Sequence, residues 1–253
     1  CQDNSYTLQS GEATQNYGSV NWTHDGAGIF TNPGSLIPTY NAATGDAAGV
    51  VTLTMTVTST NTCNPQTSKA YFSIQVDSLP EVNVIGAVSI CKGRSHTLPV
   101  GAATYSNGTY AWTHSGLGNI SSGNSLTPTY NASTEESGST VTLTLTVTSN
   151  NTCTTSASAV VRDTYSIKVD STPVAVASGS RTICQNASLT VGGTSYKDGT
   201  IQWTHNGQGV LTNTTTLTPS YTAVAQDANS VVTLIMTVSS NNSCAQHNEK
   251  AYG

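Results

Sequence analysis

Apolar and polar residues alternate along three long segments of the chain. Within each segment nearly every second residue is Val, Leu or Met, and the residues between them are mostly Thr. A period of two places one face of a strand on a core and the other in water, where threonine suits the pleated surface. We therefore predict β-strands over 51–58, 141–148 and 232–239. Their apolar positions are Val51, Leu53, Met55 and Val57, then Val141, Leu143, Leu145 and Val147, then Val232, Leu234, Met236 and Val238.

Shorter segments of the same kind lie between turn-forming residues. The sequence KAYFSIQV, at 69–76, places Phe72 and Ile74 on one parity. An earlier strand is expected to carry Leu98 and Val100, and its later equivalent Leu189 and Val191. Gly, Asn, Pro and Ser separate these segments, and no helical period persists. Many short strands at this spacing predict an all-β chain built from antiparallel β-sandwiches.

The chain is an internal repeat. Tryptophans recur after 90 and 91 residues, each is followed 18 residues later by a tyrosine, and each tyrosine is followed 23 residues later by a cysteine. Such regular spacing predicts three copies of one module of about 90 residues, as in other repeat architectures. The markers are Trp22, Trp112 and Trp203, then Tyr40, Tyr130 and Tyr221, then Cys63, Cys153 and Cys244.

The module boundaries are predicted at two similar linkers, VDSLP at 76–80 and VDSTP at 169–173. The modules are then 1–79, 80–172 and 173–253. The first lacks an N-terminal strand and the third lacks the end of its last strand, so Cys1 is read as a boundary inside a longer protein, with a lipidated N-terminal cysteine as the alternative. Because proline stiffens a short linker, we expect the modules to follow one another as an extended rod.

Charge is scarce along the chain. Charged residues make up 8% of the sequence and the formal net charge is −5. This balance gives no electrostatic reason to expect nucleic acid or an anionic membrane as a partner. No stretch approaches the roughly 18 apolar residues of a membrane span, so we expect no membrane insertion. An uncharged, hydroxyl-rich surface fits a protein outside the cell.

The six cysteines occur as two per module. Members of a pair are separated by 62, 62 and 60 residues, and no C-x-x-C pair suggests zinc. This regularity predicts structural disulfides and an oxidising compartment. Pairing within modules would close loops of about 60 residues and stabilise each by about 4 kcal/mol. The preferred pairs are Cys1–Cys63, Cys91–Cys153 and Cys184–Cys244, and the alternative joins Cys63 to Cys91 and Cys153 to Cys184.

The sequence WTHxGxG appears once in each module. On the expected strand the tryptophan shares its parity with the histidine, so we predict a core tryptophan, a half-buried histidine at the strand end, and glycines that turn the chain through positive φ. The tyrosine that follows is expected in the core or at a corner, with sugar stacking as the alternative. The histidines are His24, His114 and His205, and the tyrosines are Tyr40, Tyr130 and Tyr221.

Catalysis and metal binding are not expected. The residue after the histidine is Asp25, Ser115 and then Asn206, so an acidic partner for proton transfer is not maintained. The chain contains no G-x-S-x-G, H-E-x-x-H or P-loop sequence and no calcium-loop spacing. We therefore predict no enzyme activity, no catalytic or metal-binding residue and no cofactor.

These motifs together carry a family resemblance. WTHxGxG, LTPTY, VTLTLTVTSNNTC and VDSTP, recurring about every 90 residues, resemble the PKD-like, immunoglobulin-like tandem repeats of very large Bacteroidota surface proteins. Flavobacterial adhesins, including the gliding-motility class, belong to that group. The resemblance implies three immunoglobulin-like modules, export by the type IX secretion route and a fibre on the bacterial cell surface.

The resemblance implies that the chain is a stalk segment that spaces and presents an adhesive region. Its expected partners are neighbouring modules of the same longer chain, with lateral self-association in a filament and contact with surface glycans as further options. The alternatives are a module that binds surface polysaccharide and, through the threonine ladder, ice binding. The resemblance also makes Ser78 and Ser171 candidate O-glycosylation sites, against plain polar linker residues.

Overall fold

A computed structural model describes residues 1–62, 66–245 and 248–252. The described residues form an all-β fold with a few short 3₁₀ turns. They divide into two compact units. Unit 1 comprises Cys1–Val84, Ala103–Trp112 and Thr144–Asp163, and unit 2 comprises Ile85–Ala102, Thr113–Leu143 and Thr164–Gly253.

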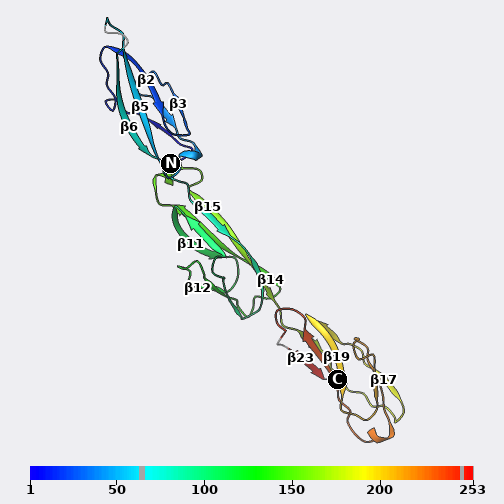
Figure 1. The fold of residues 1–253 in the computed structure, drawn as a ribbon. Helices are drawn as coiled ribbons and strands as arrows, with labels where there is room; N and C mark the ends of the chain where they lie inside the picture. The colour runs from blue at the N-terminus through cyan, green and yellow to red at the C-terminus, as the bar shows by residue number, and fades with distance from the viewer. Residues whose placement is uncertain (63–65, 246–247, 253) are drawn as a thin grey trace. The chain divides into compact units, whose positions relative to one another are not determined.

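The first repeat lies within unit 1 and contains two sheets. Strands β2, β5 and β6 form one sheet, visible side by side in Figure 1, and β1, β4 and β3 form the other. Trp22 and Tyr40, from different sheets, belong to one core with Leu8, Leu53 and Val76. The elements are β1 (Ser5–Thr7), β2 (Gly18–His24), β3 (Ile29–Thr31), β4 (Thr39–Asn41), η1 (Thr44–Asp46), β5 (Val50–Ser59) and β6 (Thr67–Gln75).

The second repeat builds the same pattern and adds strands. One sheet has the order β11-β14-β15-β8, a second the order β12-β13-β9, and β7 pairs with β10. The elements are β7 (Glu81–Val84), β8 (Ala87–Cys91), β9 (Ser95–Thr97), β10 (Ala103–Ser106), β11 (Gly108–His114), β12 (Asn119–Ser121), β13 (Thr129–Asn131), β14 (Ser139–Ser149), η2 (Thr152–Thr155) and β15 (Val160–Asp170).

The third repeat lies within unit 2. Its sheets have the orders β19-β22-β23 and β17-β21-β20, and β16 pairs with β18. Trp203 and Tyr221 share a core with Leu234, Met236 and Val238. The elements are β16 (Val174–Val176), β17 (Ser188–Thr190), β18 (Ser195–Lys197), β19 (Gly199–His205), β20 (Val210–Thr212), β21 (Ser220–Thr222), η3 (Ala225–Asp227), β22 (Leu234–Ser240) and β23 (Asn248–Tyr252).

The alternating segments form strands as predicted, with one exception. Val51, Leu53 and Met55 are buried in β5, and the equivalent positions of β14 are buried as well. In the third repeat, however, Val232 precedes β22, which begins only at Leu234. The counterpart of Val232 in the first repeat is Val51, which is held by its pairing with Ile74 of β6. The alternating pattern at Val232 is therefore not accompanied by a strand, because no described residue pairs with Val232 as Ile74 pairs with Val51.

Two further expectations are wrong. Val100 does not lie in a strand, because a turn closed by the Ala102 N–H and the Pro99 carbonyl carries it outward, and its side chain is 94% exposed. The sheets are also not wholly antiparallel, since β8 runs parallel to β15, with Ala87 opposite Ser166 and Cys91 opposite Asp170. A parallel neighbour is possible there because many residues separate the two strands.

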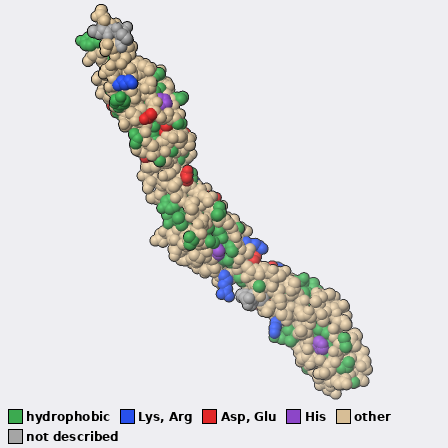
Figure 2. Space-filling model, in the orientation of Figure 1, with side chains coloured by type: hydrophobic (Ala, Val, Ile, Leu, Met, Phe, Trp, Pro, Cys, Tyr) green, Lys and Arg blue, Asp and Glu red, His purple; other side chains and the backbone are tan. Residues whose placement is uncertain are grey.

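The described surface carries few charges. Figure 2 shows scattered acidic and basic side chains among uncharged polar atoms. Among the described residues, no helix has the length and apolar character of a membrane-spanning segment.

Candidate functional site

The histidine of each WTHxGxG sequence stands at the end of a strand and packs on the following tyrosine. The ring centroids of His24 and Tyr40 are 5.0 Å apart, and those of His205 and Tyr221 also 5.0 Å. The Nδ1 atom of His24 lies 3.1 Å from the carbonyl oxygen of Gly26. In His114 and His205 the same atom is buried without a hydrogen-bond partner. No carboxylate contacts these rings among the hydrogen bonds described.

The tryptophan of the motif is a packing residue in two repeats. Trp22 and Trp203 are buried, and each donates its Nε1–H to a carbonyl 3.0 Å away, on Ser35 and Thr216 respectively. Trp112 is half-buried. The buried rings of Trp22 and Trp203 present no face on which a sugar could stack.

The residue after the histidine accepts the equivalent backbone hydrogen bond in all three repeats, although its identity changes. Asp25, Ser115 and Asn206 each accept a hydrogen bond from the backbone N–H at the start of the next long segment, at 2.7, 2.9 and 2.7 Å. The bond from Thr52 lowers the pKa of Asp25. We missed this role in the sequence because we asked for an acid, whereas the shared feature is a side-chain oxygen close to the backbone. The donors are Thr52, Thr142 and Thr233.

A tyrosine and a buried acid lock the turn that follows. In the first repeat the Tyr40 hydroxyl donates to Asp46 Oδ2 at 2.7 Å and accepts from the Gly28 N–H at 2.9 Å. The other carboxylate oxygen accepts from the Ala27 N–H at 2.6 Å. The same arrangement recurs at Tyr130, Glu136, Gly118 and Leu117, and at Tyr221, Asp227, Gly209 and Gln208.

The acids of this lock were missed because they are not identical and stand six residues after each tyrosine, in a polar stretch. Burial raises the pKa of Asp46, but the hydrogen bonds from Ala27, Tyr40 and Ala43 outweigh it and hold the pKa below its ordinary value. Burial and the bond to Asp46 raise the pKa of Tyr40 to about 12. The acid therefore stays ionised and the phenol stays protonated, which suits a structural hydrogen bond and not proton transfer.

The motif glycines are required by close approach and not by positive φ. None of them falls among the glycines with a left-handed backbone, contrary to the sequence expectation. A Cβ atom on Gly26 would collide with the Tyr40 hydroxyl and the Asp46 carboxylate, and one on Gly28 would collide with the Asn41 carbonyl. Glycine is needed because the turn lies directly on the tyrosine and the acid.

The disulfides join one repeat to the next, and the pairing preferred from the sequence is wrong. Cys1 pairs with Cys153 in unit 1, and Cys91 pairs with Cys244 in unit 2. The alternative pairing through Cys153 and Cys184 is also wrong. Cys184 is a free, exposed thiol, and Cys63 lies outside the described residues.

Strand length explains why the two cysteines of one repeat cannot meet. Cys91 lies opposite Asp170, the last residue of β15, whereas Cys153 precedes Val160, the first residue of that strand. An eleven-residue strand is about 35 Å long at about 3.3 Å per residue. Disulfide-bonded Cα atoms must lie within about 7 Å of each other, so Cys91 and Cys153 take their partners from neighbouring repeats.

Hydrogen bonds surround each disulfide in the same way. In unit 1, Asp77 accepts from the Thr152 hydroxyl at 2.7 Å, and the Asn151 side chain donates to the Ser78 carbonyl at 2.9 Å. In unit 2, Asp170 accepts from the Ser243 N–H at 3.0 Å, and the Asn242 side chain donates to the Ser171 carbonyl at 3.1 Å. The linker sequence VDS and the hairpin sequence N-[TS]-C are therefore two halves of one junction. Ser78 and Ser171 are half-buried there, and the Ser171 hydroxyl donates to Asp198 at 2.8 Å.

Among the described residues, no group of three or more His, Cys, Asp or Glu side chains is placed to hold a metal ion. The two disulfides mark a protein that folds in an oxidising compartment, extracellular or secretory.

No family model matches the chain, and no curated protein matches it. The solved structures that it resembles include the eight N-terminal immunoglobulin domains of Down Syndrome Cell Adhesion Molecule, with 12% identity and a TM-score of 0.39 over 100% of this chain and 42% of that one. They also include mouse Protocadherin-24 EC1-3, with 14% identity and a TM-score of 0.38 over 95% and 89%. A third is Bacteroides ovatus SGBP-B in complex with a mixed-linkage heptasaccharide, with 15% identity and a TM-score of 0.21 over 95% and 58%.

Proposed function

We propose that the chain is a structural stalk segment of a large repetitive adhesin or filament on a bacterial cell surface. In this proposal it spaces and presents an adhesive region, is not an enzyme and needs no cofactor. Its partners are further repeats of the same longer chain. The repeat sequences support placing it among Bacteroidota surface proteins exported by the type IX route, including those of gliding motility, with glycans on Ser78 and Ser171.

The observation that carries the proposal is the overlap of the two disulfide-closed loops. One loop runs from Cys1 to Cys153 and the other from Cys91 to Cys244, so residues 91–153 belong to both. A force applied to the two ends passes through the first disulfide, back from Cys153 to Cys91, and through the second. Most of the chain is thereby removed from the load path, which suits a segment that must keep its length under tension.

The contacts of the repeated histidines and acids do not support an active site. The repeated histidines contact tyrosine rings and, in His24, a backbone carbonyl. The repeated acids are saturated by hydrogen bonds from backbone and tyrosine. These contacts support a role for the motif in holding the turn.

Stretching single molecules tests the proposal. With both disulfides closed, the covalent path from Cys1 to Gly253 consists of the 62 residues from Cys153 back to Cys91 and the few residues after Cys244. The end-to-end length of the fully unfolded, oxidised chain should therefore not exceed about 240 Å. In reductant the whole chain should extend to about 860 Å.

Two variants serve as matched controls for the stretching experiment. Cys91→Ser should lengthen the oxidised limit to about 340 Å, because the chain after Cys153 then carries the load. Cys184→Ser removes only the free thiol and should leave the limit unchanged. An oxidised chain that extends to its full contour would refute the load-bearing role.

A further inference from the structure

Acidic and basic residues are distributed unevenly between the two compact units. Unit 1 contains seven acidic and two basic residues, so its formal net charge equals the −5 of the whole chain. Unit 2 contains six residues of each sign. On the face shown in Figure 2, acidic side chains prevail on the first repeat and most basic ones lie beyond it. Charge divided in this way along one chain favours attraction between its copies.

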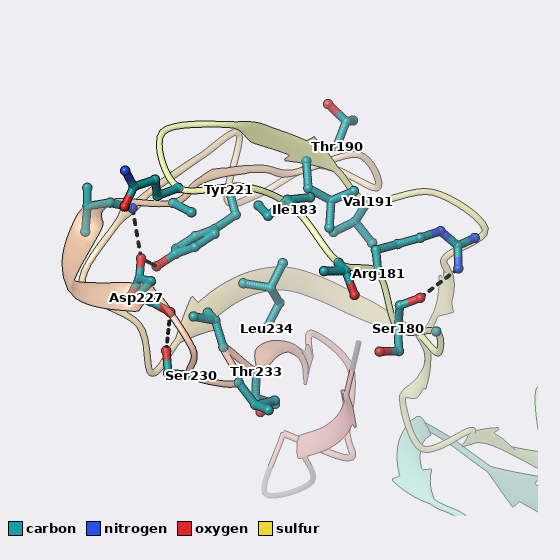
Figure 3. A pocket seen from close by; sticks show the side chains of 18 of the residues that line it. Ser180, Arg181, Ile183, Thr190, Val191, Tyr221, Asp227, Ser230, Thr233 and Leu234 are labelled. Carbon is teal, nitrogen blue, oxygen red and sulfur yellow. Dashed lines mark hydrogen bonds between the residues drawn. The ribbon is translucent and has the colours of Figure 1, made fainter.

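Burial makes the surface of unit 2 more basic than its composition. The acid Asp227 turns inward to the Tyr221 hydroxyl, whereas Arg181 lies exposed at the opposite end of the region drawn in Figure 3. Three of the six acids of unit 2 are buried, namely Glu136, Asp170 and Asp227, and none of its six basic side chains is. In unit 1, six of the seven acids are exposed or half-buried. The two units therefore present opposite excesses of charge to solvent.

Four basic residues surround the disulfide junction of unit 2. The Lys92 N–H donates to the Asp170 carbonyl at 3.0 Å, and the Lys168 ammonium lies 2.9 Å from the Asp170 carboxylate. Lys197 directly precedes Asp198, the residue that accepts a hydrogen bond from the linker. Basic residues outnumber acidic ones at this junction. We call Lys92, Arg94, Lys168 and Lys197 the basic collar, and the acids beside it are Asp170, Asp198 and the exposed Glu135.

The equivalent junction of unit 1 is acidic. The linker acid Asp77 accepts from the Thr152 hydroxyl at 2.7 Å. Asp3 lies next to Gln2, whose N–H donates to the Asp77 carbonyl at 2.8 Å. Glu81 follows the linker at the start of β7. The α-amino group of the chain lies at the same junction, and the acids still outnumber it. We call Asp3, Asp77 and Glu81 the acidic collar, and Gln2, Asn4, Gln75 and Ser106 stand where unit 2 has its basic collar.

The two junctions share their hydrogen-bonded framework and differ in the charges around it. At each junction the hairpin asparagine donates to a linker carbonyl, and the linker aspartate accepts from the hairpin. The framework therefore does not require a particular sign of charge in the residues around it. Opposite charges at matching places supply what electrostatic complementarity needs, which is attraction between unlike junctions and repulsion between like ones.

We propose that the acidic collar of one chain binds the basic collar of a second copy of this chain, so that the two copies are offset by one repeat. In a parallel, in-register pair each collar would meet its own kind and repel it, so charge sets the offset as well as the attraction. Exposed ion pairs are individually weak and are screened beyond about 8 Å at physiological salt. Association of two chains is therefore weak, and further repeats strengthen it by adding contacts. The inference goes beyond the stalk proposal, because it concerns contacts between chains and not the path of force within one.

Sedimentation velocity over a range of protein concentrations tests this contact on the whole oxidised chain. Free thiols such as Cys184 are first blocked with iodoacetamide, which adds no charge and prevents disulfide-linked dimers. At about 10 mM salt, where the Debye length is about 30 Å, we expect the weight-average sedimentation coefficient to rise with concentration. At about 1 M salt, where the Debye length is about 3 Å, it should stay at the monomer value. Absence of any rise at low salt would rule the contact out.

Charge reversal at single exposed positions separates the contact from an effect of net charge. Glu81→Lys and Lys197→Glu should each lower the association constant by about threefold or more, because an attractive pair becomes repulsive. Combining the two restores opposite signs and should return the constant to near the parent value. Lys69→Glu, which makes the same change of charge on β6 outside both collars, should associate like the parent chain.

Glu81→Lys gives the decisive result, because it brings the net charge of the chain closer to zero. A mechanism that depends only on net charge predicts stronger association for this variant, whereas the collar contact predicts weaker association. Unchanged far-ultraviolet circular dichroism reports that each variant folds. Association of Glu81→Lys at or above the parent level, or failure of the double variant to recover, would overturn the proposal whatever the stretching experiment gives.

Discussion

At the scale of single residues, the repeated motif is a hydrogen-bonding device. Its histidine stands at a strand end and packs on a tyrosine, the residue after the histidine accepts a backbone N–H, and its glycines lie on a tyrosine and an acid. The tyrosine hydroxyl bridges the Gly28 N–H and the Asp46 carboxylate in the first repeat, so its loss would leave the Gly28 N–H without its acceptor and the carboxylate with one donor fewer. This explains why the aromatic residue carries a hydroxyl in every copy.

Tyr221→Phe should lower the free energy of unfolding of the third repeat by about 1–3 kcal/mol, because Asp227 loses a donor and the Gly209 N–H loses its acceptor. Urea denaturation followed by tryptophan fluorescence, to which Trp203 contributes beside Trp22 and Trp112, measures the change. Tyr196→Phe removes a hydroxyl from an exposed ring of the same repeat and should change stability by less than about 0.5 kcal/mol. A similar loss in both variants would contradict the lock.

At the scale of elements, strand length decides which cysteines can pair. The β15 strand separates Cys91 from Cys153 along its whole length, so the linker and the hairpin of neighbouring repeats meet instead. At that meeting Asp170 accepts from Ser243 and forms an ion pair with Lys168 at 2.9 Å. The acid is buried and its contacts hold the junction together.

The junction should weaken in acid. Burial raises the pKa of Asp170, but the Lys168 side chain and the Ser243 N–H outweigh it and lower the pKa below its ordinary value. A lowered pKa means that the stabilisation is complete above the unfolded-state value of about 3.9 and is lost as pH falls through the folded-state value. Melting temperatures of the parent and of Asp170→Asn should therefore converge below about pH 4 and differ at pH 7.

Glu249→Gln is the control for this pH dependence, since Glu249 is exposed on β23. Its melting temperature should follow that of the parent chain across the same pH range. If Asp170→Asn gave a constant difference down to pH 2, ionisation of Asp170 would not be the source of the stabilisation.

At the scale of the whole molecule, the disulfides make neighbouring repeats covalently dependent on each other. Cys1 and Cys91 hold the same position in the first and second repeats. They pair with Cys153 and Cys244, at sequence separations of 152 and 153 residues. The third cysteine of that series, Cys184, is free and exposed. Each of the two disulfides therefore links one repeat to the next, and neither closes a loop within a single repeat.

Tryptic mapping without reduction checks this connectivity. Cleavage after Lys and Arg gives 1–69 with Cys1 and Cys63, 70–92 with Cys91, 95–162 with Cys153 and 198–250 with Cys244. We expect 1–69 linked to 95–162 and 70–92 linked to 198–250. The peptide 182–197 should carry an alkylated Cys184. A link between 70–92 and 95–162 would instead show pairing within the repeat.

The sequence by itself determined the all-β class, the internal repetition, the parity of the long strands and the absence of a maintained acid–base pair. These properties are local: alternation, spacing and residue identity can be read along the chain. Tertiary structure alone decided the disulfide partners and the acid that meets each tyrosine. Each depends on which distant segments lie side by side, and a strand about 35 Å long can carry two cysteines of one repeat to opposite ends.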